Sequence, residues 1–208
     1  MNSIAIMIML LFVIIIIRYA NKKIFDNELS IDIGDKDIVS PVDGIIVYNR
    51  IVGNDPIICN KRKDIIMSSL WLLDYRQIGL YMSIYDRHCV VSPKDGVISK
   101  IEEIGERKDK ESMIDIINFI KYYYFGITPK MNITDNYSIV YNIDDIVLIV
   151  ISDKYIGKIT MLKKQGDQVK KGEKICKIDK GSQVDLFIPA LYKIVKKRIF
   201  KIGDNIVV

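Results

Sequence analysis

Short runs of β-branched residues, each introduced by a turn signal, recur along this chain and restrict it to a fold built from strands. Ser-Pro-Val-Asp-Gly at 40–44 leads into Ile-Ile-Val, and Ser-Pro-Lys-Asp-Gly at 92–96 leads into Val-Ile-Ser. Pro and Asp-Gly favour a turn, whereas Ile and Val fit the pleated surface of a strand. Apolar runs at 78–84 and 144–151 have the same character. We therefore expect a β-dominated, barrel-sandwich-like domain of several short strands.

Residues 111–126 depart from this pattern and predict one short helix, which makes the domain mixed α+β. The segment has apolar residues at mixed spacing, is rich in Phe and Tyr, and ends at a glycine. One interpretation is a helix that covers the core. The other is an aromatic lip that faces a membrane, because Tyr favours the lipid–water boundary. The sequence leaves the role of this segment open.

The N-terminus begins with seventeen residues that carry no charge, and residues 4–17 are apolar without interruption. A helix of seventeen residues is roughly 25 Å long, slightly shorter than a hydrocarbon core of ~30 Å. The competing interpretation is a cleaved signal peptide, but the segment lacks a basic n-region and a small-residue cleavage site. We therefore expect a retained transmembrane helix within an N-terminal membrane anchor at 1–23.

Three positive charges follow the apolar segment, at Arg18, Lys22 and Lys23. By the positive-inside rule they predict a single-pass membrane protein whose main body lies on the cytoplasmic side. Residues 24–37 form a polar linker with Gly and Asp turn signals, and residues 38–208 form the main domain.

The net charge of +5 is concentrated in this N-terminal group and in the stretch 192–201. Basic clusters suit either an anionic membrane surface or nucleic acid. No RNA-binding signature of interleaved aromatic and basic residues is present, so we expect a membrane partner and no nucleic acid.

Cysteine and histidine usage argues against a metal site. The three cysteines, Cys59, Cys89 and Cys176, show no C-x-x-C spacing, which is unlike a thiolate zinc site or a disulfide framework. His88 is the single histidine of the chain, so a His-rich metal site is excluded. We expect no bound metal.

Three residues are candidates for chemistry, although each also has an ordinary structural explanation. His88 stands at the end of a predicted strand and suits a surface or satisfied core position. Asp43 lies in a Pro-Val-Asp-Gly turn, where an aspartate caps its own backbone. Ser182 follows Gly181 inside an apolar strand, where glycine marks a bulge or a close backbone approach. Spacing alone does not bring these residues together.

Three motifs, in order, resemble those of the short form of phosphatidylserine decarboxylase. The stretch 171–189, KGEKICKIDKGSQVDLFIP, resembles the self-processing segment of that family. IVSPVDGIIV at 38–47 resembles its aspartate motif, and SIYDRHCVVSP at 83–93 resembles its Asp-x-His motif. The similarity extends from Ile38 to the C-terminus.

The chain departs from the family pattern close to these motifs. Val90 and Val91 stand where the family usually has an Asn-Arg pair, and longer members carry a second histidine at the position of Val91. Lys180 replaces an apolar residue before the Gly-Ser pair, and Gln183 replaces an arginine after it.

The resemblance implies a lyase that is made as a zymogen and forms its own cofactor. Ser182 attacks the carbonyl of Gly181, and an elimination then cuts the chain into a β chain (1–181) and an α chain (182–208). Ser182 becomes a covalent pyruvoyl group, the electron sink for decarboxylation of phosphatidylserine to phosphatidylethanolamine. Because a serine hydroxyl needs a base, the resemblance implies His88 as base and later proton donor, with Asp43 supporting the imidazolium.

The implied partners are the phospholipid substrate, the membrane and the two cleaved chains, which stay associated. Whether the enzyme is a homo-oligomer is left open.

Two alternatives remain at this stage. Residues 166–175 predict a hairpin like that of biotinyl or lipoyl carrier domains, but Lys180 nearby lacks the Met or Ala neighbours of a modified lysine. A membrane-anchored relative that no longer processes is the second alternative, because of the changes at Lys180, Gln183 and Val91. Cleavage before Ser182 would distinguish these possibilities.

Overall fold

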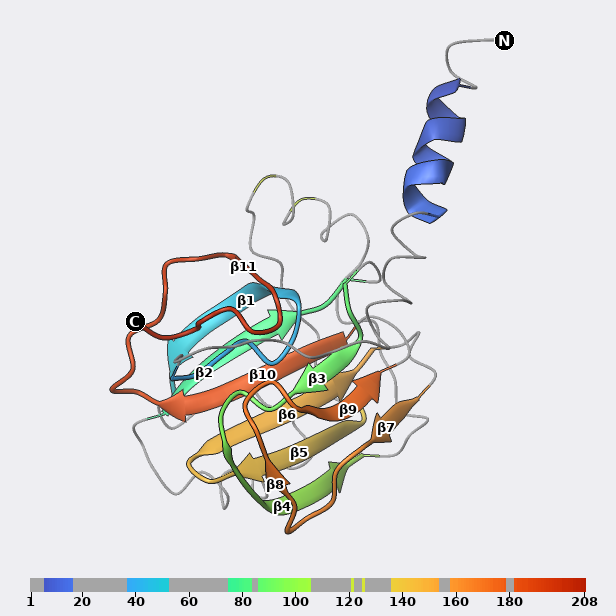
Figure 1. Cartoon of the computed structure of the whole chain (residues 1–208). Coiled ribbons are helices and arrows are strands. Elements are labelled where there is room, and N and C mark those ends of the chain that lie inside the picture. The colour runs from blue at the N-terminus through green and yellow to red at the C-terminus, as the bar shows by residue number, and fades with distance from the viewer. Residues whose placement is uncertain are drawn as a thin grey trace.

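The computed structural model describes residues 6–16, 37–52, 75–83, 86–105, 121, 125, 136–153, 158–178 and 182–208. In these ranges the chain forms a helix at 6–16 and eleven strands (Figure 1). The strands are β1 (Gly44–Ile51), β2 (Tyr75–Tyr81), β3 (Cys89–Val91), β4 (Gly96–Ile104), β5 (Ser138–Ile143), β6 (Ile146–Ser152), β7 (Ile159–Met161), β8 (Gln168–Val169), β9 (Lys174–Ile178), β10 (Ser182–Pro189) and β11 (Ile199–Phe200).

The strands form two antiparallel sheets, which confirms the prediction of a β-dominated fold. The larger sheet has the order β11-β1-β2-β10-β6-β5-β4-β8, and the smaller has the order β3-β9-β7. The smaller sheet packs on one face of the larger, because Val90 of β3 and Ile175 of β9 share a buried cluster with Val184 of β10 and Leu148 of β6. Strand β10 is therefore central, with β2 on one side and β6 on the other.

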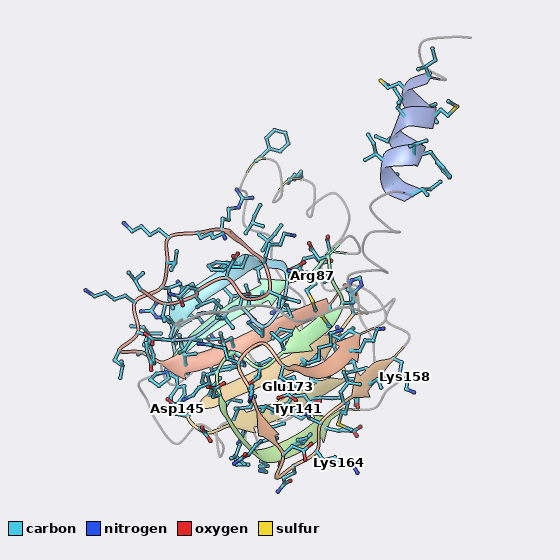
Figure 2. All side chains as sticks on the ribbon, viewed as in Figure 1. Arg87, Tyr141, Asp145, Lys158, Lys164 and Glu173 are labelled. Carbon is cyan, nitrogen blue, oxygen red and sulfur yellow. The ribbon has the colours of Figure 1, made fainter. Side chains whose placement is uncertain are left out.

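Burial follows the period of two that a strand imposes on its side chains. Along β10, Val184 and Leu186 join the core between the sheets, whereas Phe187 joins a second cluster on the opposite face. Tyr141 is also buried inside the sandwich, while Lys158 and Lys164 point outward (Figure 2). Because side chains alternate along a strand, the even-numbered residues of β10 face the smaller sheet and the odd-numbered residues face the opposite side.

The two turn–strand repeats form as predicted and use the same local bond. The hydroxyl of Ser40 donates to the carbonyl two residues on at 2.7 Å, and the hydroxyl of Ser92 does the same at 2.7 Å. Strands β1 and β4 then start at Gly44 and Gly96. A Cβ on Gly96 would lie 2.5 Å from the carboxylate of Asp144, so a side chain at this position would force that carboxylate to move.

The predicted hairpin at 166–175 is wrong, although its turn is present. Gly172 has a positive φ of 80°, as a tight turn requires. The flanking strands, however, do not pair with each other: β8 pairs with β4, and β9 pairs with β3 and β7. A turn is encoded locally, but the partners of a strand are chosen by the surfaces that it can bury.

Three predicted segments are only partly covered by the described residues. The N-terminal helix is observed over 6–16, yet within the described ranges no helix is long and apolar enough to cross a membrane. The predicted helix at 111–126 lies outside the described residues except for Lys121 and Phe125, which are both helical. The linker at 24–37 lies outside them except for Asp37.

Candidate active site

Ser182 occupies the first position of β10, at the centre of the larger sheet. Its carbonyl accepts a hydrogen bond of 2.7 Å from the amide of Met82, and it pairs directly with Ser152 of β6. By the alternation along β10, its side chain shares a face with Val184 and points toward the smaller sheet. The side chain is fully buried, and its hydroxyl has no hydrogen-bond partner among the described residues. Gly181 lies outside the described residues.

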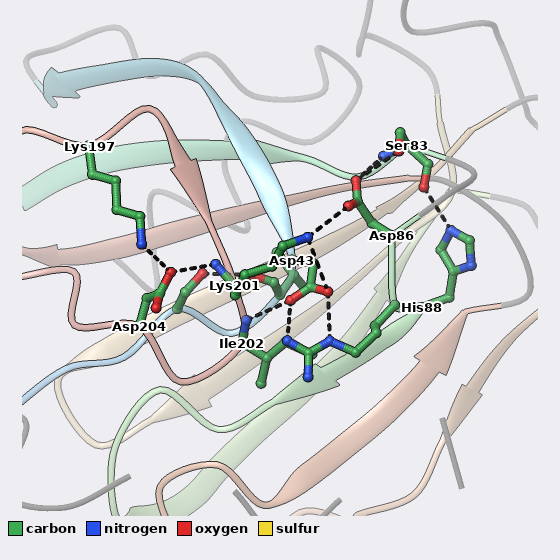
Figure 3. Close-up of polar contacts among 11 residues, drawn as sticks. Asp43, Ser83, Asp86, His88, Lys197, Lys201, Ile202 and Asp204 are labelled. Carbon is green, nitrogen blue, oxygen red and sulfur yellow. Dashed lines mark hydrogen bonds and ion pairs between the residues drawn. The ribbon is translucent and has the colours of Figure 1, made fainter. Parts of the chain in front are cut away.

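His88 lies just before β3, in the layer that covers this face of β10. Its carbonyl accepts a bond of 2.8 Å from the amide of Ile178, four residues before Ser182. Its Nε2 lies 3.1 Å from the carbonyl oxygen of Ser83, which directly follows Met82 (Figure 3). These contacts bring His88 and Ser182 to the same end of the sandwich. Since a carbonyl only accepts, Nε2 carries a proton, and in the neutral form of the ring Nδ1 would hold the lone pair.

Asp43 has a different partner from the one that the sequence predicted. Its carboxylate receives two bonds from the guanidinium of Arg87, at 2.6 and 2.5 Å, and one of 2.7 Å from the amide of Ile202. The Nζ of Lys201 lies 3.8 Å away. The expected pair between Asp43 and His88 is therefore not formed in this structure, because the neighbouring guanidinium satisfies both carboxylate oxygens (Figure 3).

Asp86 is linked to the imidazole through Ser83, a connection that the sequence did not predict. One of its oxygens accepts bonds from both the amide and the hydroxyl of Ser83, each at 2.9 Å, and the other lies 3.5 Å from Nζ of Lys201. Ser83 in turn offers its carbonyl to His88. The sequence signal was available, since Asp86 belongs to the Asp-x-His motif, but spacing does not show that it acts through Ser83.

The Asp43–Arg87 pair is expected to stabilise the site strongly, because both groups are largely buried, with side-chain exposures of 4% and 13%. In a Ser182→Ala background that keeps the chain in one piece, Asp43→Asn should lower the free energy of unfolding by about 3–5 kcal/mol, since it removes the carboxylate charge that faces a largely buried guanidinium. Urea denaturation measures this loss. Asp145→Asn is the matched control, because it removes an exposed pair with Lys94 and should cost less than about 1 kcal/mol. Equal losses in the two variants would contradict the assignment.

A buried polar network lies on the opposite face of β10. The carboxylate of Asp185 accepts bonds from the hydroxyl of Tyr48 at 2.7 and 2.6 Å, and from the amides of Gln77 and Gln183 at 2.7 Å each. The ring of Tyr48 passes over Gly79, where a Cβ would lie 2.5 Å from it. Gln183, which stands where the family has arginine, is thus accommodated as a neutral donor to a buried acid.

Burial raises the pKa of Asp185 to about 6, and its three hydrogen-bond donors only partly oppose the shift. A carboxyl whose pKa is higher in the folded state stabilises the fold at low pH and loses that contribution as pH rises through about 6. In the uncleaved background, Asp185→Asn should therefore gain stability relative to the parent between pH 4 and 7. The gain should be on the order of 3 kcal/mol, since each pKa unit corresponds to about 1.4 kcal/mol. Parallel stability profiles for parent and variant would contradict this expectation.

The fold and the site together define an antiparallel β-sandwich protein, with a buried serine at the start of its central strand and a histidine at the same end of the sandwich. The chain belongs to the phosphatidylserine decarboxylase family, whose family model matches residues 18–208. This family is one of decarboxylases, which are lyases acting on a phospholipid. A search of curated proteins found no match to the chain.

Proposed function

We propose that the chain cleaves itself between Gly181 and Ser182, and that the product decarboxylates phosphatidylserine to phosphatidylethanolamine. The observation that carries the proposal is the Ser182 hydroxyl, which is fully buried without a partner in the described part of the chain. A buried hydroxyl without a hydrogen bond costs about 1–3 kcal/mol, so its place at the start of the central strand favours a chemical role. The family match supports the same reaction.

The described residues suit the first step. Ser182 Oγ attacks the carbonyl carbon of Gly181 as the proton of the hydroxyl passes to Nδ1 of His88. The C–N bond then breaks to leave an ester, and the nitrogen of residue 182 takes that proton and becomes a free amine. Asp86 and Ser83 hold the imidazole through Nε2, which keeps Nδ1 as the basic nitrogen. Asp43 anchors the neighbouring Arg87 and the C-terminal segment rather than the imidazole itself.

The second part of the reaction depends on the pyruvoyl group that Ser182 would become. When formed, this group accepts the electron pair released as carbon dioxide leaves the substrate. The buried Ser182 hydroxyl fits the origin of such a group, because solvent is excluded there. We expect His88 to return a proton to the product carbon.

The departures at Val91 and Gln183 are compatible with processing, because both side chains have partners in the fold. Val91 is fully buried with Cys89 and Ile202, and Gln183 donates to Asp185. Neither change places a charge next to Ser182. These two positions therefore favour a processing enzyme over a relative that has lost cleavage, whereas Lys180, the third change, lies outside the described residues.

The two chains are expected to stay together after cleavage. Strand β10 is bonded on one side to β2 and on the other to β6, and both neighbours belong to the longer chain. The C-terminal segment adds backbone bonds from Ser40 to Asp204 at 2.8 Å and from Ile206 to Ile38 at 2.9 Å. Cutting one peptide bond removes none of these contacts.

The intact mass of the purified protein tests the proposal. We expect a chain that ends at Gly181 and a chain of 27 residues, from 182 to 208. The short chain should resist Edman degradation, because its terminus is a ketone rather than an amine. A single full-length species under all conditions would contradict the proposed function.

We also propose that the protein works at a membrane, with its body on the cytoplasmic side. The helix at 6–16 exposes apolar side chains all round, including Phe12 at 64% and Leu11 at 61%. Lipid is the partner that suits such a surface. The C-terminal segment adds exposed basic residues that suit anionic headgroups, namely Lys193, Lys196, Lys197, Arg198 and Lys201.

Deletion of residues 1–17 should separate membrane binding from self-processing. The family match begins at residue 18, so we expect the deleted protein to cleave itself at the parent rate. Its turnover of phosphatidylserine in vesicles should fall on the order of tenfold or more, because proximity to the bilayer is lost. Vesicle flotation and carbon dioxide release measure the two effects, and a short-chain soluble substrate serves as the control. Loss of cleavage would show that residues 1–17 are part of the fold.

A further inference from the structure

Ser152 faces Ser182 across the larger sheet. The two residues are directly opposite each other in the antiparallel pair of β6 and β10. The next pair on this face is Val150 with Val184, and both valines lie in the core between the sheets. The side chains of Ser152 and Ser182 therefore point to the same face, toward the layer that carries His88.

The Ser152 hydroxyl is buried and has no hydrogen-bond partner in the described part of the chain. Its backbone, by contrast, is held on both sides: the amide donates to Tyr137 at 2.9 Å, and the carbonyl accepts from Asn136 at 2.6 Å. Opposed residues of an antiparallel pair have Cβ atoms about 5 Å apart. Two serine hydroxyls span such a distance by rotation about their Cα–Cβ bonds.

We propose that Ser152 is a catalytic residue of self-processing, whose hydroxyl donates a hydrogen bond to Oγ of Ser182 while that oxygen leaves. The inference rests on the proposed function and adds a residue to it. It explains why two buried hydroxyls without partners face each other across the sheet. A fully aliphatic pair would avoid the cost of burying them.

The chemistry assigns Ser152 to the second step rather than the first. During attack, Oγ of Ser182 gives up a lone pair, and a donor to that oxygen would weaken it as a nucleophile. In the elimination, a base removes the Cα proton of residue 182, a Cα=Cβ double bond forms, and the Cβ–Oγ bond breaks. Oγ then departs with the electron pair as part of the Gly181 carboxylate, and a donor stabilises the growing negative charge. Solvent water afterwards replaces the nitrogen of residue 182 to give the ketone and ammonia.

Ser152→Ala is therefore expected to accumulate the ester. Maturation of the full-length protein should slow by at least about tenfold, by comparison with the loss of a single hydrogen-bond donor to a developing oxyanion. Hydroxylamine added under native conditions should cut the uncleaved chain, because it attacks an ester and spares an amide. The products are a hydroxamate at Gly181 and a fragment whose first residue reads as serine.

Two variants control for packing. Ser138→Ala removes another buried hydroxyl from the same end of the sheet, but Ser138 pairs with Ile151 and faces the opposite cluster. It should mature at the parent rate. Ser152→Thr keeps the hydroxyl and should mature faster than Ser152→Ala without hydroxylamine-sensitive material. Thermal unfolding shows that each variant is folded.

The outcomes separate this inference from the proposed function. If the parent protein does not cleave, the proposed function itself fails. If the parent cleaves and Ser152→Ala matures at the same rate, or matures slowly with no ester, the role of Ser152 is overturned while the proposed function stands.

Discussion

Ser182→Ala is expected to remain a single full-length chain, with no detectable fragment of 182–208 at any incubation time. The variant keeps the backbone bond to Met82 and the pairing with Ser152, so the fold should persist. It lacks the one oxygen that can attack the Gly181 carbonyl. The expected loss is complete, because no other atom of residue 182 can form the ester. Intact mass over a time course measures it.

Ser182→Cys tests the same step with a different nucleophile. Its thiol is a nucleophile of similar reach, so partial cleavage is expected, with a thioester in place of the ester. Cleavage of Ser182→Ala at the parent site would show that the chain is cut by another agent and would overturn self-processing.

His88→Ala is the second substitution with a large expected effect. The imidazole is 2% exposed and is fixed by the Ser83 carbonyl, so no water can replace it freely as a base. We expect maturation to slow by about 10²–10⁴-fold, which is the usual contribution of a general base. Gel electrophoresis of freshly purified protein measures the uncleaved fraction.

His88→Gln is the matched control that separates a structural role of residue 88 from a role as the base. The glutamine amide can still donate to the Ser83 carbonyl, but it has no basic nitrogen. If both variants mature slowly, and added imidazole partly restores maturation of His88→Ala, the result supports His88 as the base. Maturation of His88→Gln at the parent rate would show that the residue only holds the segment in place.

The sequence predicted those features that depend on a few neighbouring residues. The turns at 40–44 and 92–96, with strands beginning at Gly44 and Gly96, follow from Ser-Pro-x-Asp-Gly and the β-branched residues behind it. The β-dominated class follows from the same local preferences. The family could be inferred because its three motifs are contiguous stretches that occur in the family's order and keep Asp43, His88 and Ser182.

Tertiary structure decided which of these residues meet. Asp43 pairs with Arg87 rather than His88, β8 and β9 join different sheets, and Ser152 stands opposite Ser182. None of these contacts can be predicted from neighbouring residues in the sequence, because strand pairing joins segments that are far apart in the chain and that bury a surface together. A carboxylate likewise takes the nearest cation that folding supplies, and here that cation is a guanidinium one residue before the histidine that the sequence had assigned to it.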